Sequence, residues 1–262
     1  MPKFAANLST LFGEVGFLDR FEAAAKAGFR AVECQFPYDW PAAEVAARLK
    51  AFDLELVLHN LPPGDFAAGE RGIACLPGRE VEFREGLDRA ITYAKALACP
   101  RLNCLAGIAP AGADKRALRE TLVANLRHGA RALADVGIEL LVEPINGYDM
   151  PDFFVQRSAD AVALFDEVGH ENVHLQYDVY HMQRMEGDLG STLKRLLPRI
   201  GHVQIADNPG RHEPGTGEIN FDYVFRRLEA LGYDGWIGCE YTPKTTTLEG
   251  LDWMNRVRIG AR

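Results

Sequence analysis

The chain has 262 residues, of which 47% are hydrophobic and 25% charged, and its formal net charge at pH 7 is −8. Acidic and basic residues are mixed along the chain without a Lys/Arg run, which excludes the basic face that a nucleic-acid binder needs. No apolar stretch approaches the roughly 20 residues of a membrane helix, so neither nucleic acid nor a membrane is expected as a partner.

Short β-rich runs alternate with amphipathic helical stretches along the whole chain. The predicted strands cover residues 3–9, 31–36, 54–61, 101–107, 138–145, 173–179, 202–207 and 236–241. The predicted helices cover residues 17–28, 41–52, 79–98, 114–137, 158–169, 189–201 and 221–232, with a last helical stretch at 245–257. Several of these helices stop at a glycine that suits a left-handed C′ position: Gly28, Gly137, Gly169 and Gly232.

The repeat of strand and helix predicts the fold. Eight repeats in about 260 residues are typical of an α/β chain that closes into a single (β/α)8 TIM barrel, here one domain over residues 1–262. A doubly wound open sheet has a similar rhythm, but the first turn, "NLSTLFGEVGF", lacks the G-x-G-x-x-G fingerprint of its dinucleotide-binding members. The irregular segment at residues 62–78 is longer than a passive connection needs, so we interpret it as a lid or binding loop.

Polar residues mark the ends of the last four predicted strands: Glu143, Asp178, Gln204 and Glu240. Side chains alternate along a strand, so Leu141 and Glu143 share one face while Val142 lies on the other. In the same way Gly238 and Glu240 share a face. The apolar alternates suit the layer between barrel and helices, and the carboxylates are therefore expected to point inward at the catalytic rim.

Three carboxylates and one amide that converge in this way need a compensating charge. One or two of the carboxylates are protonated, or a cation is bound. Oxygen ligands of this kind suit Mg²⁺ or Mn²⁺ better than Zn²⁺ or copper. The alternative for any single residue is a structural ion pair at the rim. Four such residues on consecutive strands favour a divalent metal site formed by Glu143, Asp178, Gln204 and Glu240.

Two histidines and an arginine lie at or just after the ends of predicted strands. His181 follows Asp178 by three residues, and His59 closes the third predicted strand. Each is either a hydrogen-bonded packing residue or a substrate contact. Arg211 lies in a Gly-bounded loop, where an arginine is usually a surface residue. If that loop folds over the site, the Arg211 guanidinium matches a substrate carboxylate.

Long stretches of the sequence resemble the hydroxypyruvate isomerase family, which is part of the xylose-isomerase-like TIM barrels. The resemblance runs nearly end to end and rests on "FAANLSTLF", "GFRAVECQFPYDW", "NLPPGDFAAGERGIACLPGRE", "LVEPIN", "QYDVYHMQRMEGDL", "HVQIADNPGRHEPGTGEINF" and "GCEYTP". It implies the same four metal ligands and implies that Glu143 and Glu240 move protons. His181 and Arg211 match positions that contact substrate in related sugar epimerases.

At two positions the chain differs from the sugar epimerases of the wider superfamily, and both differences concern the choice of substrate. Asp149 falls where the epimerases place a Glu, so the resemblance makes it a substrate contact with a shorter reach. Gln204 stands where the epimerases have a His ligand, which favours the isomerase branch. The resemblance therefore implies an intramolecular oxidoreductase that interconverts hydroxypyruvate and tartronate semialdehyde, or a close 2-oxo acid pair, through an enediolate.

Other functions remain open at this stage. A 2-oxo-tetronate isomerase or a ketose 3-epimerase would use the same metal site on another oxo-acid or sugar. Phosphodiester cleavage of abasic DNA, as in endonuclease IV, would need several His ligands and a basic face. A non-catalytic sugar-acid binder would not need two glutamates. Barrel enzymes of this kind are often oligomers, so fold analogy leaves a homo-oligomer open, and the sequence does not determine the oligomeric state.

The cysteines and the N-terminus indicate the compartment. The five cysteines are scattered, odd in number and form no C-x-x-C pair, which is typical of free thiols in a reducing environment. The first ten residues, "MPKFAANLST", have neither an apolar core nor a cleavage-site pattern. We therefore expect a cytoplasmic protein.

Overall fold

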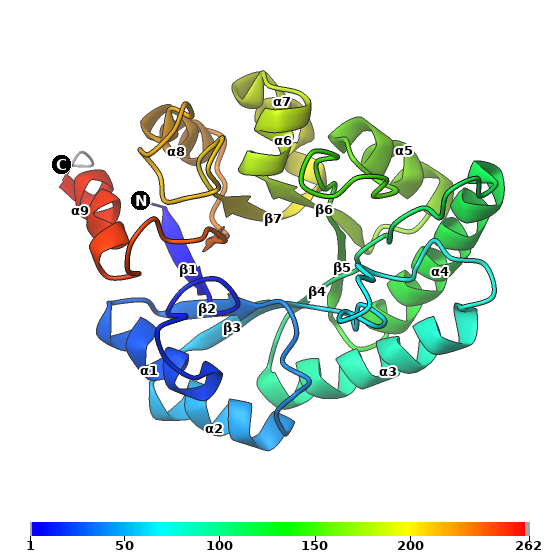
Figure 1. Cartoon of the computed structure of the whole chain (residues 1–262), viewed down its shortest axis with the longest axis horizontal. Helices are drawn as coiled ribbons and strands as arrows, with labels where there is room; N and C mark the ends of the chain where they lie inside the picture. Colours follow the sequence, from blue (N-terminus) through cyan, green and yellow to red (C-terminus); the bar gives the residue numbers. More distant parts are fainter. Residues whose placement is uncertain (1, 260–262) are drawn as a thin grey trace.

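The computed structural model, which describes residues 2–259, is a closed barrel of eight parallel strands surrounded by helices (Figure 1). Each strand pairs with the next in the chain, and β1 pairs with β8 to close the barrel. The strands are β1 (Lys3–Asn7), β2 (Ala31–Cys34), β3 (Glu55–Asn60), β4 (Arg101–Asn103), β5 (Glu139–Val142), β6 (Val173–Asp178), β7 (Ile200–Ile205) and β8 (Trp236–Cys239). The predicted fold class is confirmed.

The helices form the outer ring of Figure 1. They are α1 (Phe17–Lys26), α2 (Ala42–Ala51), α3 (Glu80–Leu97), α4 (Lys115–Ala134), α5 (Ser158–Val168), α6 (Val179–Met185), α7 (Leu189–Leu196), α8 (Phe221–Ala230) and α9 (Asp252–Ile259), with 3-10 turns η1 (Leu197–Arg199) and η2 (Glu249–Leu251). Leucines at four-residue spacing on α4 are buried against the barrel, and burying each leucine is worth roughly 1.5–3 kcal/mol. No helix in the described part of the chain is long and apolar enough to cross a membrane.

Several strands are shorter than predicted, most clearly β4, which ends at Asn103 rather than at residue 107, and the helices differ in three places. The helix expected at 189–201 ends at Leu196, because Pro198 turns the chain into η1 and β7 then begins at Ile200. The last helix begins only at Asp252, after η2. The short helix α6 was not predicted. It starts directly after β6, where the Asp178 carboxylate accepts a hydrogen bond from the Tyr180 backbone N–H at 2.8 Å.

The barrel interior changes from apolar to polar along its axis. Its lower part is filled by a small apolar cluster: Ala5, Ala31, Val57, Leu58 and Leu141, with Trp236 packed against it. The next inward positions of β2 and β7 are Glu33 and His202, which are fully buried and 2.7 Å apart. The predicted alternation is therefore confirmed, and the polar side chains gather toward the C-terminal end of the strands.

A bulge in β3 alters this alternation at one strand. Val32 pairs with Leu56 but Glu33 pairs with Leu58, so Val57 is an extra residue in β3. Val57 and Leu58 consequently both belong to the inner cluster. The shift sends the next residue, His59, to the outer side of the barrel.

Candidate active site

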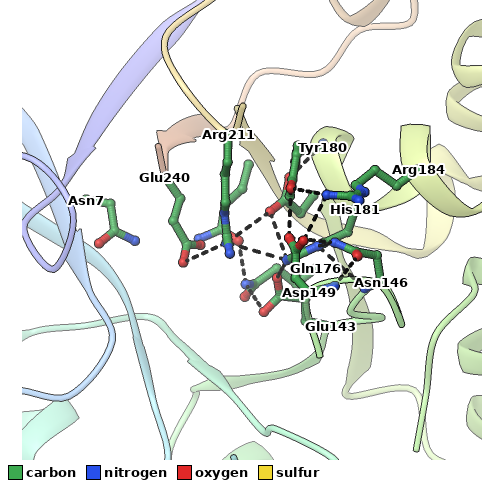
Figure 2. Close-up of polar contacts among 12 residues, drawn as sticks. Asn7, Glu143, Asn146, Asp149, Gln176, Tyr180, His181, Arg184, Arg211 and Glu240 are labelled. Carbon is green, nitrogen blue, oxygen red and sulfur yellow. Dashed lines mark hydrogen bonds and ion pairs between the residues drawn. The ribbon is translucent and has the colours of Figure 1, made fainter. Parts of the chain in front are cut away.

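The four predicted metal-site residues meet at the C-terminal end of the barrel. Asp178 ends β6, Gln204 lies on β7, and Glu143 and Glu240 follow β5 and β8 by one residue. All four side chains are buried, none with more than 5% of its surface exposed. Figure 2 shows Glu143 and Glu240 directed into one space together with Arg211 and His181. The sequence-predicted convergence is thus present in the structure.

Burial and repulsion act together on the three carboxyl groups. Burial raises the pKa of the Glu143 carboxyl well above its usual range, and the charges of Glu240 and Asp178 raise it further. Burial also raises the pKa of Glu240 and of Asp178, although Arg211 lowers both. The Arg211 Nη2 atom lies 3.5 Å from Glu240 and 3.9 Å from Asp178, so one guanidinium compensates part of the cluster. More positive charge would stabilise the ionised cluster.

A divalent ion fits the donor atoms that the chain presents. The Oδ2 atom of Asp178 is buried and has no hydrogen-bond partner within the described residues, which is costly for a carboxylate oxygen. One oxygen each from Glu143 and Asp178 and a nitrogen of His181 lie within 4.8 Å of one another. These atoms form a group that could hold a metal ion.

The orientation of Gln204 is set from below by Glu33. The Gln204 Nε2 donates to Glu33 Oε1 at 2.7 Å, and Asn7 donates to the same oxygen at 3.0 Å. Because a carboxylate offers only acceptors here, the amide nitrogen of Gln204 is identified by this contact. The amide oxygen is therefore the atom that accepts from Gln176 Nε2 at 2.6 Å, and the same Nε2 also donates to Glu143.

A second amide, Gln176, connects two members of the cluster. Its Nε2 donates to Glu143 Oε2 at 3.0 Å and to Gln204 Oε1 at 2.6 Å. Asn103 on β4 donates to the same Glu143 oxygen at 3.2 Å. Glu143 Oε1 is left free of these amides and lies toward His181, at 3.6 Å from its Nε2 atom.

His181 is a neutral donor in this geometry. Asn146 Oδ1 accepts from the backbone N–H groups of Tyr148 and Asp149, which identifies its other side-chain atom as nitrogen. That nitrogen lies 2.7 Å from His181 Nδ1, so Nδ1 accepts and Nε2 carries the proton. Burial lowers the pKa of His181 well below its usual range, and Arg211 and Arg184 lower it further. The Nε2–H therefore points at the cluster as a hydrogen-bond donor.

The loop that carries Arg211 is built around Asp207. One Asp207 oxygen accepts from the backbone of Asn208 and Ile219, and the other accepts from Gly215 and Gly217 at 2.8 and 2.9 Å. Arg211 itself has a positive φ of 54°, which this hydrogen bonding must support. The loop folds over the site, as the sequence hypothesis for Arg211 required.

Asp149 is already occupied by protein partners. Its carboxylate accepts from Tyr180 Oη at 2.7 Å, from Asn146 at 3.0 Å and from Arg184 Nη1 at 2.8 Å. It lines the cavity together with Met150. The structure therefore brings Asp149 to the site as part of a network around Tyr180 and Asn146 (Figure 2).

His59 is not brought to the site. Its Nδ1 atom lies 3.3 Å from Tyr38 Oη and 3.2 Å from the Asn60 carbonyl, in the layer between barrel and helices. Burial lowers the pKa of His59 to about 4, so it is neutral there. The bulge in β3 explains this position, since Leu58 and Asn60 face the cavity instead.

The cavity above the cluster is small, with a volume of about 200 Å³. Apolar side chains line one part of its wall: Phe36, Leu58, Phe66, Leu105, Ile145 and Met150. Polar side chains line the rest and include Arg71 and Gln35, whose amide donates to Glu240 at 2.8 Å. A cavity of this size suits a substrate of a few carbon atoms rather than a large ligand.

Several residues of the site were missed by the sequence reasoning: Glu33, Gln176, Asn146 and Arg71. Gln176 could have been found, because it precedes Asp178 by two residues and therefore shares its inward face. Glu33 has the same kind of signal within "AVEC", as a lone polar residue in an apolar strand. Asn146 and Arg71 lie in loops, where no periodicity indicates direction.

The sequence comparisons point to one family and to close relatives. The family model described as xylose isomerase-like TIM barrel matches residues 21–257. The chain is 55% identical to hydroxypyruvate isomerase of Escherichia coli (strain K12), over 98% of this chain and 100% of the relative. It is 52% identical to 2-oxo-tetronate isomerase of Cupriavidus necator, over 97% of this chain and 98% of the relative.

The structural comparison agrees on the fold. A crystal structure named AP endonuclease, family 2, from Brucella melitensis superposes with a TM-score of 0.96 at 50% identity and covers 98% of this chain and 99% of that one. The three relatives thus share nearly the whole chain but carry different functional names.

Proposed function

The chain belongs to the xylose isomerase-like TIM barrel family, and from this premise we propose that it is a metal-dependent isomerase of short 2-oxo acids. The reaction proposed is the interconversion of hydroxypyruvate and tartronate semialdehyde, or of a close 2-oxo acid pair. The observation that carries the proposal is the buried cluster of Glu143, Asp178, Gln204 and Glu240 beneath a cavity of about 200 Å³.

The metal part of the proposal rests on the donor set. Glu143, Asp178, Gln204 and Glu240 would hold Mg²⁺ or Mn²⁺, since all four offer oxygen and the Asp178 Oδ2 atom has no hydrogen-bond partner among the described residues. Such an ion would act as a Lewis acid that stabilises negative charge on the substrate oxygens. His181 is not assigned as a ligand, because its Nε2 atom carries a proton.

The two glutamates are proposed to move the protons. One removes a proton from the hydroxyl-bearing carbon and the other returns a proton to the adjacent carbon, through an enediolate form of the substrate. The hydroxyl proton passes to the former carbonyl oxygen. Burial raises the pKa of both carboxyl groups, whereas a bound divalent ion would lower it; the same ion would make the carbon-bound proton of the substrate more acidic, so its two effects partly offset each other. Positioned proton transfer of this kind is worth about 10²–10⁴-fold in rate.

The remaining polar groups would orient the substrate and stabilise its charge. The Nε2–H of His181 is directed at the same space as the Glu143 and Asp178 oxygens, so it can donate to a substrate oxygen that becomes more negative. Arg211 lies over the Tyr180 ring, with its guanidinium carbon 5.3 Å from the ring centre, and closes the cavity on that side. Burial of the cluster excludes water from the proton transfers.

The test is exchange of the substrate's carbon-bound proton in deuterated water. The metal-loaded wild type should exchange this proton, and Glu143→Gln and Glu240→Gln should each abolish the exchange. Glu120→Gln, on an exposed part of α4, is the matched control. Retained exchange in both glutamine variants would overturn the assignment.

A panel of three- to six-carbon substrates with Mg²⁺ and Mn²⁺ distinguishes the related activities. The relatives are named for a three-carbon and a four-carbon oxo acid, and the small cavity favours chains of this length over six-carbon ketoses. Turnover of ketoses alone would identify a ketose 3-epimerase. Binding without turnover of any member would indicate a non-catalytic sugar-acid binder.

The name of the Brucella structure makes endonuclease activity a second candidate. The charge of −8 and the single histidine in the metal-type cluster of the described residues argue against it. A duplex with one abasic site, incubated with the metal-loaded protein, should remain uncut. Cleavage that Glu143→Gln removes would favour the endonuclease.

A further inference from the structure

Arg71 lines the same cavity as the carboxylate cluster but comes from the long loop at residues 62–78. Its neighbours in the cavity wall include Phe66 from the same loop, and Glu143, Arg211 and Glu240 from the strand ends. A cation at this position faces the substrate from the side of β3 and β4, whereas Arg211 approaches from β7.

One edge of the Arg71 guanidinium is free of protein partners. The Nη1 atom donates to the backbone carbonyls of Phe66 and Glu70, at 3.1 and 2.8 Å. The guanidinium carbon lies 3.8 Å from the centre of the Phe66 ring. Among the described residues no carboxylate oxygen lies within 4.0 Å of this arginine, and neither Nε nor Nη2 has a hydrogen-bond partner. These two atoms form the planar fork that binds a carboxylate with two parallel hydrogen bonds.

The other two arginines of the site are already neutralised by acidic side chains. Arg211 Nη2 lies 3.5 Å from Glu240 and 3.9 Å from Asp178. Arg184 Nη1 lies 2.8 Å from Asp149 and also donates to Tyr180 Oη. Of the three arginines, only Arg71 keeps its charge without an acidic partner in the described part of the chain. A substrate carboxylate would supply that partner.

The backbone beside Arg71 is held in place by close packing. Gly72 has a φ of 98°, and a Cβ atom there would lie 2.3 Å from the Leu105 carbonyl oxygen. The Gly72 N–H donates to the Pro63 carbonyl at 2.9 Å, and Cys75 donates to Ala106 at 2.8 Å. The loop is therefore fixed against the segment after β4 before substrate binds, which lowers the entropic cost of using its side chain.

We propose that Arg71 is a specificity-determining residue that binds the carboxylate of a 2-oxo acid substrate through its free Nε–Nη2 edge. The inference rests on the proposed isomerase function and adds to it the group that selects acids over uncharged sugars. The carbonyl and hydroxyl groups of the same substrate then lie toward Glu143 and Glu240.

The experiment compares Arg71→Met with the wild type. Methionine keeps an unbranched apolar side chain that can pack on Phe66, but it removes the charge and the two N–H donors of the guanidinium edge. We expect the KM for the best oxo-acid substrate to rise about 10- to 100-fold, the range of a lost charge-assisted hydrogen bond, with kcat changed by less than about threefold. Arg71→Lys should lie in between.

Two further measurements separate the outcomes. Arg79→Gln is the matched control, because Arg79 directly follows the same loop and pairs with Glu70 and Glu82 but does not line the cavity. Calorimetric binding of glycerate, a three-carbon acid that cannot isomerise, measures carboxylate recognition without turnover. Arg71→Met should lose this binding and Arg79→Gln should keep it.

An unchanged KM and unchanged glycerate affinity in Arg71→Met would overturn the role of Arg71 while the isomerase function stands. Equal losses in Arg71→Met and Arg79→Gln would overturn it as well, since loop order would then be the cause. If the wild type isomerises no member of the panel, the proposed function fails. Glycerate binding that depends on Arg71 would still support carboxylate recognition in that case.

Discussion

The side-chain nitrogen of Asn146 lies 2.7 Å from Nδ1 of His181, and this contact determines which ring nitrogen of the histidine carries the proton. The orientation of the Asn146 amide is fixed, because a flip would break its hydrogen bonds. Its oxygen accepts hydrogen bonds from two backbone N–H groups of its own loop, and its nitrogen also donates to Asp149. A loop residue that touches no proposed metal ligand thereby makes His181 a donor toward Glu143 and Asp178.

Asn146→Asp should reverse this tautomer. A carboxylate at position 146 accepts a hydrogen bond from Nδ1–H and leaves Nε2 as an acceptor, so His181 can no longer donate to a substrate oxygen. We expect kcat to fall by about 10²-fold, the usual cost of losing one such donor. NMR of ¹⁵N-labelled histidine should show an Nε2–H tautomer for His181 in the wild type and Nδ1–H in the variant. Unchanged signals from the other six histidines are the control. An Nδ1–H tautomer in the wild type would contradict the assignment.

Glu33→Gln tests the support beneath Gln204. The Glu33 carboxylate accepts hydrogen bonds from Gln204 and Asn7, and its other oxygen lies 2.7 Å from His202. Glutamine keeps one acceptor oxygen where the carboxylate offered two and carries no charge, so the support of the Gln204 amide is weakened. We expect Mn²⁺ affinity, measured by calorimetry, to fall about 10- to 100-fold. Glu55→Gln, at the exposed start of β3, should bind Mn²⁺ like the wild type. Normal affinity in both Glu33→Gln and Gln204→Ala would mean that Gln204 is not a ligand.

Much of the site could be predicted because a strand has a period of two and the active face of a barrel lies at the strand ends. Glu143, Asp178 and Glu240 follow from these two rules and need no long-range information. The same rule places His59 at the site, and that prediction is wrong. One extra residue at Val57 reverses the side to which β3 directs its later side chains. A bulge depends on pairing with the neighbouring strand, and a single strand sequence does not report it.

Contacts between loops could also not be predicted from the sequence. Asp149 and Arg184 are 35 residues apart and meet only because α6 follows β6 directly. The seven residues of α6 are too few to show an apolar stripe. The free edge of Arg71 is likewise a property of the folded loop. Local pattern therefore predicted the barrel and the convergence of the four polar side chains, while the groups that orient His181 and the cavity wall depend on tertiary contacts.

Removing Asp207 should release the loop over the site. Its two oxygens accept four backbone N–H groups, of which the Ile219 N–H is buried, and a buried N–H left unpaired costs about 1–3 kcal/mol. We expect Asp207→Ala to lower the free energy of unfolding by at least about 2 kcal/mol and to raise the KM by freeing Arg211. Asp207→Asn keeps the oxygen facing Asn208 and Ile219, so its losses should be smaller. Urea denaturation and steady-state kinetics measure both effects. Equal stability of the wild type and Asp207→Ala would show that the loop does not depend on this residue.

Metal binding should stabilise the protein more strongly as the pH rises. The carboxyl pKa values of Glu143, Asp178 and Glu240 are raised in the folded chain, mainly by burial. The folded state therefore binds more protons than the unfolded state above the usual carboxyl pKa, and the metal-free protein loses stability as the pH rises through this range. A divalent ion compensates the ionised cluster and offsets this loss.

Thermal unfolding with Mn²⁺ and with EDTA at pH 5.5 and pH 8 measures the effect. At pH 8 and 100-fold excess over its dissociation constant, Mn²⁺ should add about 2.7 kcal/mol, or roughly 5–10 °C in Tm. The difference should be smaller at pH 5.5, where protons compete for the same oxygens. Asp178→Asn keeps the oxygen that accepts from the Tyr180 N–H and removes the unpaired Oδ2, so it should be more stable than the wild type in EDTA at pH 8 and gain nothing from Mn²⁺. A Tm increase that is independent of pH, or that survives in Asp178→Asn, would place the ion elsewhere in the protein.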